Sequence, residues 1–250
     1  MDNSLFLRPD FSIFKYHFPN KQLLPGGLMI DLCIEMINEK LPFSKSFTCS
    51  FKSPCLPNDL IQFDTKIVSG IQKVKILSDA KVKALISITN SYAFPSDLAY
   101  IDPRLITNKK FGFIHAKEIT FLHQYLLMSR NQNQISASGK YIAGDNRKYF
   151  ATEFSVSSNF GMFFELIEFM GLTCLAANHE AGILSSTDLY GFVKFTGFQV
   201  KRPIREKEVL TCFIRSEKDD IALSWSGYIT SGSEIIAVVE NVLSILIKED

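Results

Sequence analysis

The sequence predicts an α+β fold made of two similar units, in each of which a helix is followed by antiparallel strands. Three observations support this prediction. The chain has 250 residues, more than one typical domain, and 46% of them are hydrophobic, which is enough to bury a large core. A segment with a helical apolar period followed by several strand-like segments occurs twice. Two blocks of the first unit also align with two blocks of the second.

The first unit begins with a strand-like segment at 11–18 and a turn at Pro25-Gly26-Gly27. Apolar residues then recur with helical spacing over 28–40, and a proline before two glycines suits a helix N-terminus. Strand-like segments follow at 46–51, 59–68, 74–78 and 82–94. Residues 95–110 contain two prolines and have no steady period, so we expect a connection there.

The second unit repeats this order. Strand candidates at 124–130 and 134–144 precede a segment of helical period at 161–180. Four further strands are predicted, at 191–202, 208–216, 220–230 and 234–248. We therefore expect a first unit over residues 1–95, a linker over 96–112 and a second unit over 113–250.

The internal repeat rests on two aligned blocks. Residues 27–32 align without a gap with 161–166, which places Asp31 on Glu165. Residues 51–63 align with 200–212. The offset is 134 positions in the first block and 149 in the second, so the second unit carries about fifteen extra residues between helix and sheet. Two blocks in the same order predict a degenerate tandem duplication.

Composition excludes several classes of protein. The net charge is +1 and no long run of one sign occurs, so neither nucleic acid nor an anionic membrane is an expected partner. Five cysteines without a CxxC pair favour reduced thiols over a disulfide framework or a zinc site. The N-terminus lacks the pattern of a secretory signal, and the apolar stretch 235–247 is interrupted by Glu240. We expect a cytoplasmic protein that needs no cofactor or metal.

The densest group of candidate functional residues lies at the start of the first unit. His17, the helix start at Gly26 and the carboxyl group of Asp31 fall within fifteen residues. An imidazole can act as a general base, free amides at a helix start can stabilise an oxyanion, and a buried carboxyl group can donate a proton. Together they suit proton abstraction next to a carbonyl. The alternatives are a packed histidine and, for Asp31, a solvated helix stripe.

The segment HFPNKQLLPGGLMID, which starts at His17, resembles the active-site segment of the 3-hydroxyacyl-(acyl-carrier-protein) dehydratases, enzymes of hot-dog fold. In that family Pro-Gly follows the histidine by eight residues and an acid follows it by fourteen, which matches Pro25 and Asp31. The segment FKSPCLPNDLIQF, from Phe51, and the segment HQYLLMSR, from His123, also resemble parts of the family pattern. The resemblance implies a double hot-dog, in which an antiparallel sheet wraps around two central helices.

The second unit departs from the family pattern because no histidine matches His17. The residue fourteen positions before Glu165 is Ala151, and a slip of two residues brings Glu153 to that position instead. In the family the active site forms between two hot-dog units, with the histidine from one and the acid from the helix of the other. The resemblance therefore implies one complete site, with His17 as the base and Glu165 as the acid, and makes Asp31 the second choice for the acid.

The resemblance also implies the substrate and the partner. Backbone amides near Gly26, Gly27 or Gly161 would hold the substrate oxygen. The reaction would be dehydration of 3-hydroxyacyl thioesters, carried by an acyl carrier protein, to trans-2-enoyl thioesters in fatty acid or polyketide biosynthesis. The protein could be a monomer or a homo-oligomer. Two alternatives stay open: another hot-dog enzyme, such as a thioesterase or an enoyl hydratase, and a non-catalytic acyl-binding partner subunit.

Overall fold

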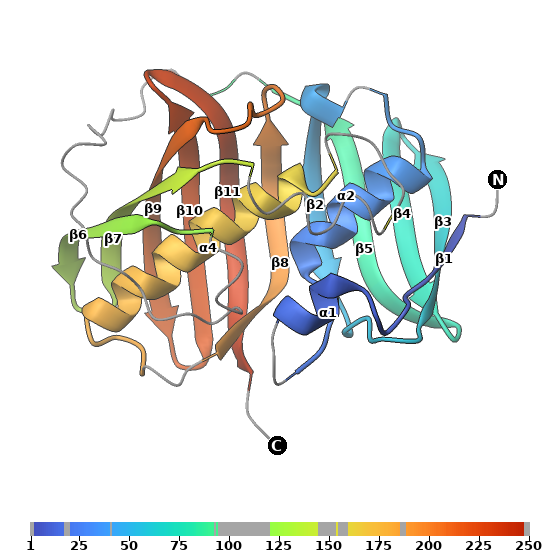
Figure 1. Cartoon of the computed structure of the whole chain (residues 1–250), viewed down its shortest axis with the longest axis horizontal. Helices are drawn as coiled ribbons and strands as arrows, with labels where there is room; N and C mark the ends of the chain where they lie inside the picture. The colour runs from blue at the N-terminus through green and yellow to red at the C-terminus, as the bar shows by residue number, and fades with distance from the viewer. Residues whose placement is uncertain are drawn as a thin grey trace.

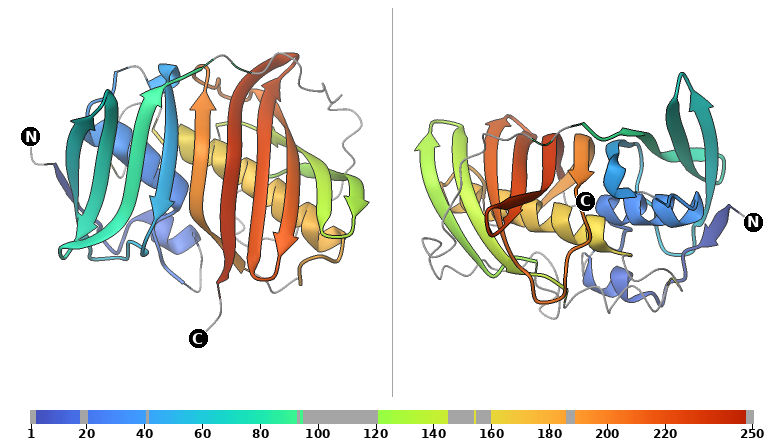
Figure 2. Two further views of the ribbon diagram at one scale, coloured as in Figure 1. Left: turned by 180° about the vertical axis from the view of Figure 1, so that it is seen from behind. Right: turned by 90° about the horizontal axis from the view of Figure 1, so that it is seen from above.

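A single antiparallel sheet runs through both units. The computed structural model describes residues 3–17, 21–40, 42–92, 94, 121–144, 154, 160–185 and 189–247. Within these residues the strands form an 11-stranded sheet in the order β1-β3-β4-β5-β2-β8-β11-β10-β9-β7-β6. The two long helices, α2 and α4, lie on one face of this sheet (Figures 1 and 2). The predicted α+β class, with an antiparallel sheet around two central helices, is confirmed.

The first unit contributes one half of the sheet. Its elements are β1 (Ser4–Phe6), α1 (Ser12–Tyr16), α2 (Gly26–Met36), the 3-10 turn η1 (Pro42–Ser44), β2 (Lys45–Phe51), β3 (Leu60–Val68), β4 (Ile71–Ser78) and β5 (Lys81–Asn90). The strand-like pattern at 11–18 was a wrong prediction, because this segment contains the short helix α1. Phe11, Phe14 and His17 are buried and stand three residues apart, a spacing that places them on one side of a helical turn.

The second unit contributes the other half. Its elements are β6 (Gln124–Asn131), β7 (Gln134–Ile142), α4 (Met162–Glu180), β8 (Leu189–Val200), β9 (Val209–Asp219), β10 (Ala222–Ser231) and β11 (Glu234–Ile247). All the predicted strands of this unit and its helix are confirmed. The linker expected at 96–112 lies outside the described residues, so the unit boundaries stay a prediction.

The units meet in the sheet and on its helical side. In the sheet, β2 pairs with β8 in antiparallel register, with Phe47 opposite Phe198. The ring of Phe163, at the start of α4, packs edge-on against both, with centroid distances of 5.2 and 5.8 Å. On the helical side, a Cβ on Gly27 would lie 3.1 Å from the Cα of Phe164. Because Gly27 has no side chain, α2 can approach the backbone of α4 closely.

The repeat is visible in the turns that lead into β3 and β9. Asp59 Oδ2 accepts a hydrogen bond from the Leu56 amide at 2.9 Å, and Glu208 Oε2 accepts one from the Arg205 amide at 2.8 Å. These pairs are related by the predicted offset of 149. The residue before each acid has a positive φ, 71° and 63°. The second aligned block therefore has one local structure in both units.

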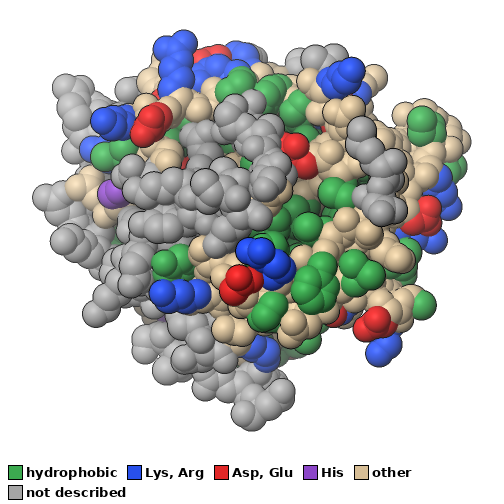
Figure 3. All heavy atoms as spheres, turned by 45° about the vertical axis from the view of Figure 1, so that its right-hand side comes forward, with side chains coloured by type: hydrophobic (Ala, Val, Ile, Leu, Met, Phe, Trp, Pro, Cys, Tyr) green, Lys and Arg blue, Asp and Glu red, His purple; other side chains and the backbone are tan. Residues whose placement is uncertain are grey.

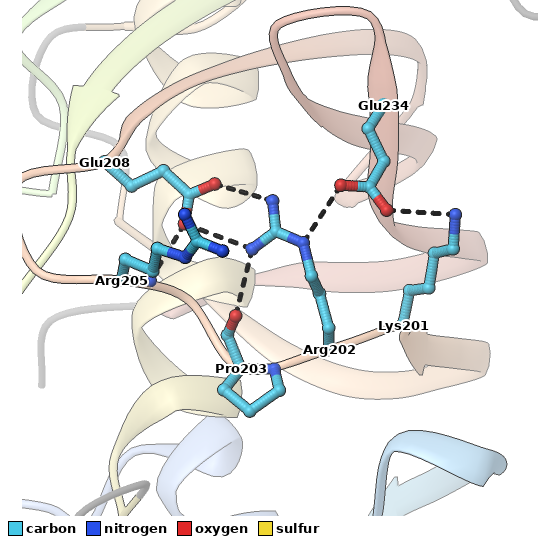
Figure 4. A network of polar contacts seen from close by, with 6 residues as sticks. All are labelled: Lys201, Arg202, Pro203, Arg205, Glu208 and Glu234. Atoms are coloured by element: carbon cyan, nitrogen blue, oxygen red, sulfur yellow. Dashed lines mark hydrogen bonds and ion pairs between the residues drawn. The ribbon is translucent and has the colours of Figure 1, made fainter.

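A network of ion pairs closes this turn in the second unit (Figure 4). Arg202 Nη2 lies 2.6 Å from Glu208 Oε1, and Arg202 Nε lies 3.0 Å from Glu234 Oε2. Lys201 Nζ is 3.0 Å from the other oxygen of Glu234. Burial raises the pKa of Glu208, but the hydrogen bonds from Arg202 prevail and lower it to about 2. Arg202 thus joins the end of β8 to the starts of β9 and β11.

The β1 end of the sheet carries apolar side chains at its surface. Phe6 and Leu60 are paired across β1 and β3 and are each about half exposed. Figure 3, which turns this end of the molecule forward, shows hydrophobic side chains interspersed with basic and acidic ones. None of the helices in the described part of the chain is long and apolar enough to cross a membrane.

Candidate active site

A cavity of about 350 Å³ lies between the two units. Its wall is formed by residues around α1 and the start of α2, by one face of α4 and by parts of β8, β10 and β11. Most of the lining is apolar. Two of the lining residues from different units can transfer protons, His17 and Glu168. An apolar cavity with a few convergent polar groups is typical of a small-molecule site.

His17 directly follows α1 and is 5% exposed. Its backbone amide donates to the Ile13 carbonyl at 2.9 Å, which anchors the residue to the helix. The ring Nδ1 lies 3.3 Å from the carbonyl oxygen of Leu23, and Phe164 packs against the ring edge-on. A carbonyl oxygen can only accept, so Nδ1 carries the hydrogen in this contact and the lone pair of the neutral ring is on Nε2. The imidazole is thus oriented to act as a base through Nε2.

Glu168 lies in the second turn of α4 and is 6% exposed. Burial raises the pKa of its carboxyl group to about 8. The group is therefore mostly protonated at neutral pH and can donate a proton into the cavity. Sequence reasoning did not choose Glu168, although it lies only three residues from Glu165.

The three glycines expected to hold the substrate oxygen have different positions. Gly26 is the first residue of α2 and lines the cavity. No described side chain caps this end of α2, and amides in the first turn of a helix have no intrahelical partner. Gly27 lies at the close contact between α2 and α4. Gly161 is the N-cap of α4, with a φ of 80°, and is not among the described residues that line the cavity.

The carboxyl group of Glu165 lies at the end of β7. Its Oε1 accepts hydrogen bonds from the hydroxyl of Tyr141 and, at 2.7 Å, from the amide of Gly144. Both partners belong to β7 or directly follow it, in the second unit. Among the described residues, those that line the cavity include Glu168 and not Glu165. The structure therefore does not bring His17 and Glu165 together as the resemblance implied.

Asp31 is buried at the contact between the two helices. Its Oδ2 accepts a hydrogen bond from the amide of Phe164 at 2.8 Å, and its Oδ1 accepts one from the amide of Phe163 at 3.3 Å. Burial raises the pKa of Asp31 to about 8, and these amides reduce the rise. Asp31 thus holds the N-terminus of α4 and is not among the described cavity residues.

The structure also shows why Glu168 was missed. Asp31 follows His17 by fourteen residues, and Glu168 follows Phe154 by fourteen. Phe154 is 9% exposed and packs against Phe11 with a centroid distance of 4.7 Å. Because Phe154 is not a histidine, the spacing of fourteen residues that leads to Glu168 could not be recognised in the sequence.

The cavity has a basic rim. Lys21 and Lys52 are exposed and line it, and Glu168 is the single acid among the described lining residues. The rim therefore carries net positive charge, which attracts anionic groups.

Comparisons with known proteins give a family match over part of the chain and structural matches over nearly all of it. A model of the ApeI-like family, described as ApeI dehydratase, matches residues 1–87, a range that contains His17 and Asp31. No protein with a curated description matches the sequence significantly.

Solved structures match nearly the whole chain. The dehydratase domain of PpsC from Mycobacterium tuberculosis, in complex with C12:1-CoA, has a TM-score of 0.70 at 14% identity, over 98% of this chain and 92% of that chain. The dehydratase domain of the CurH module of curacin polyketide synthase has a TM-score of 0.70 at 10% identity, over 98% and 90%. An N-terminal dehydratase from the difficidin assembly line has a TM-score of 0.67 at 12% identity, over 98% and 93%.

These matches establish the fold. The chain shares the double hot-dog architecture of polyketide synthase dehydratase domains, and the resemblance to hot-dog dehydratases inferred from the sequence is confirmed.

Proposed function

We propose that the chain dehydrates 3-hydroxyacyl thioesters, presented by an acyl carrier protein, to trans-2-enoyl thioesters. One observation carries this proposal: His17 from the first unit and Glu168 from the second line the same apolar cavity. The family match over residues 1–87 and the fold shared with dehydratase domains support it.

His17 takes the proton. With Nδ1 hydrogen-bonded to the Leu23 carbonyl, Nε2 removes a proton from C2 of the substrate, and the C2–H electrons become available to form the C2–C3 double bond. The negative charge that develops on the thioester oxygen is stabilised by the amides that begin α2 at Gly26.

Glu168 gives a proton. Its neutral carboxyl group protonates the 3-hydroxyl as the C3–O bond breaks, so that water leaves and the enoyl thioester remains. The imidazolium and the carboxylate then return to their starting states by proton exchange with solvent. No net proton is consumed in the cycle.

The basic rim suits a carrier-bound substrate. The pantetheine arm that tethers an acyl chain to a carrier protein ends in a phosphate group. Lys21 and Lys52 place two cationic side chains at the rim, and such side chains can bind a phosphate. The charge of the rim is therefore compatible with a thioester that carries a phosphate.

The test is an assay of the purified full chain with a 3-hydroxyoctanoyl carrier-protein thioester, in which enoyl absorbance and free thiol are followed together. We expect enoyl formation by the wild type and none by His17→Ala, with both proteins folded by circular dichroism. Release of free thiol would support the thioesterase alternative. Binding of the substrate without either product would support the acyl-binding subunit.

A further inference from the structure

We propose that Gly171, Phe192 and Trp225 set the length of the acyl chain that the cavity accepts, and that this chain is of medium length, with at most about eight carbons beyond C3. The inference rests on the proposed function for the identity of the ligand. It is carried by the geometry of the cavity beyond Glu168.

One face of α4 forms a straight wall of the cavity. Glu168, Gly171, Leu172 and Leu175 all line it, and their spacing of three, four and seven residues places them on one side of the helix. At a rise of 1.5 Å per residue, the distance from Glu168 to Leu175 along the axis is about 10 Å. Beyond the acid this wall has no charged side chain among the described residues, so it suits a hydrocarbon.

Two aromatic rings that line the cavity pack against α4 at Gly171. A Cβ on Gly171 would lie 3.1 Å from Phe192 Cζ and 3.8 Å from Trp225 Cζ2. The rings of Phe192 and Trp225 are themselves neighbours, with centroids 6.2 Å apart. Trp225 and the adjacent lining residue Leu223 are 3% and 1% exposed, so this part of the cavity is deep.

Because Gly171 has no side chain, the Phe192 ring can pack closely against α4. Glycine inside a helix is less stable than alanine, so a glycine there has a local reason. At 3.1 Å an added methyl group would force the Phe192 ring to move. The cavity lies beside this ring, and a displaced ring would narrow the path of the acyl chain.

These dimensions set the expected ligand. An extended hydrocarbon advances a little over an ångström per carbon, so the wall of about 10 Å that starts at Glu168, which faces C3, takes about eight carbons beyond C3. A four-carbon chain would stop short of Trp225, and a sixteen-carbon chain would exceed the wall. The volume of about 350 Å³ is at the small end for ligand cavities and agrees with this limit.

Trp225 is the single tryptophan of the chain, so its fluorescence reports binding without any turnover. The probes are saturated butanoyl-, octanoyl- and hexadecanoyl-pantetheine phosphate, which lack the 3-hydroxyl group and cannot be dehydrated. We expect octanoyl to change the emission and to bind at least tenfold more tightly than the other two. Equal responses to all three, or no response to octanoyl, would overturn the inference.

Two substitutions change the cavity in opposite directions. Gly171→Ala should lower the affinity for octanoyl relative to butanoyl at least tenfold, because Phe192 moves into the path. Phe192→Ala should raise the relative affinity for hexadecanoyl at least tenfold. Phe213→Ala is the matched control, since Phe213 stacks on Tyr228 and is not among the described cavity residues. If Gly171→Ala does not fold, Phe192→Ala alone decides, and an unchanged length profile would refute the inference.

The inference and the proposed function fail in different ways. If octanoyl binds next to Trp225 and the wild type dehydrates no substrate, the proposed function fails and the length determinant stands. If the wild type dehydrates 3-hydroxyacyl thioesters and neither substitution shifts the order of chain lengths, the inference fails and the function stands.

Discussion

The carboxyl group of Asp31, on α2, accepts a hydrogen bond from the backbone amide of Phe164, on α4, at 2.8 Å. The neighbouring amide of Phe163 donates to the other oxygen of the same group. A side chain of the first unit therefore satisfies two of the amides that the first turn of a helix leaves without intrahelical partners. Asp31 therefore connects the two units, whereas the family pattern has a catalytic acid at its position.

Removing this carboxyl group should destabilise the fold. In Asp31→Ala two buried amides lose their acceptor, and we expect the free energy of unfolding to fall by about 2 to 3 kcal/mol. Urea unfolding followed by circular dichroism measures this change. The control is Asp64→Ala, at an exposed position of β3, where the change should stay within about 0.5 kcal/mol. Equal midpoints for Asp31→Ala and the wild type would show that the amides find other partners.

Two glutamates on the same helix provide a matched pair for catalysis. We expect Glu168→Gln to lower kcat at least about a hundredfold, because the amide cannot protonate the leaving hydroxyl. Glu165→Gln makes the same chemical change three residues away and keeps a carbonyl oxygen that can accept from Tyr141 and Gly144. It should retain most of the activity in the enoyl absorbance assay. The reverse result would assign the acid to Glu165, as the family resemblance implied.

The pH profile should report the protonated acid. Burial raises the pKa of Glu168 to about 8, and the proposed mechanism needs the neutral form. We expect kcat/KM to fall as pH rises through about 8, approaching tenfold per unit at higher pH. Initial rates measured between pH 6 and 10, with saturating and with limiting thioester, check this fall at high pH. Activity that stays constant well above pH 9 would mean that another group donates the proton.

The free energy of unfolding should depend on pH through the same carboxyl group of Glu168. The ordinary pKa of a glutamate is 4.5, and that of Glu168 in the fold is about 8, so between these values the folded chain binds more protons than the unfolded one. The contribution of Glu168 to stability therefore decreases as pH rises from about 5 to 8. Glu168→Gln removes this pH-dependent contribution. The free energy of unfolding of the variant, relative to that of the wild type, should therefore rise between pH 5 and 8 by at least about 1.4 kcal/mol, the equivalent of one pKa unit.

Urea unfolding of both proteins at the two ends of the window measures this difference. Asp31 titrates in both proteins, so its effect cancels in the comparison. A relative stability that does not change with pH would mean that Glu168 is ionised in the folded chain.

The ion pairs around Arg202 should contribute to stability above acid pH. Arg202→Met removes the two hydrogen bonds that Arg202 donates to the half-buried Glu208. This should lower the free energy of unfolding by about 1 to 3 kcal/mol at neutral pH. Because the pKa of Glu208 is lowered to about 2, this contribution is present above its ordinary value of 4.5 and is lost as pH falls toward 2. Lys201→Met is the control, since its pair with Glu234 is exposed and should contribute less than about 1 kcal/mol. Equal losses in the two variants at neutral pH would contradict this account.

Much of the fold could be predicted from the sequence because each element buries one face. Alternation along β9 and the helical period of α4 are strong signals, and both elements occur where the patterns place them. The segment of α1 is different. Its five residues are too few to separate a helical from a strand-like period, and tertiary burial of Phe14 and Ile13 decides its conformation.

The site was predicted only in part. His17 and Gly26 line the cavity as residues of the recognised segment. Glu168 was missed because the sequence block aligns Asp31 with Glu165, whereas an alignment with Glu168 needs an offset three residues larger. Three residues are almost one helical turn, so both alignments keep the apolar pattern of α4. They differ by about 60° around the helix axis, which is enough to direct Glu168 into the cavity and Glu165 toward β7.

The pairing of β2 with β8 has a consequence for how the molecule unfolds. Backbone hydrogen bonds join β2 of the first unit to β8 of the second. Separating the units would expose Phe47, Phe163 and Phe198 to water. It would also expose the close contact between α2 and α4 at Gly27. Neither half keeps its hydrophobic interior without the other. We therefore expect the two repeats of the sequence to unfold together rather than one at a time, because each covers apolar surface of the other.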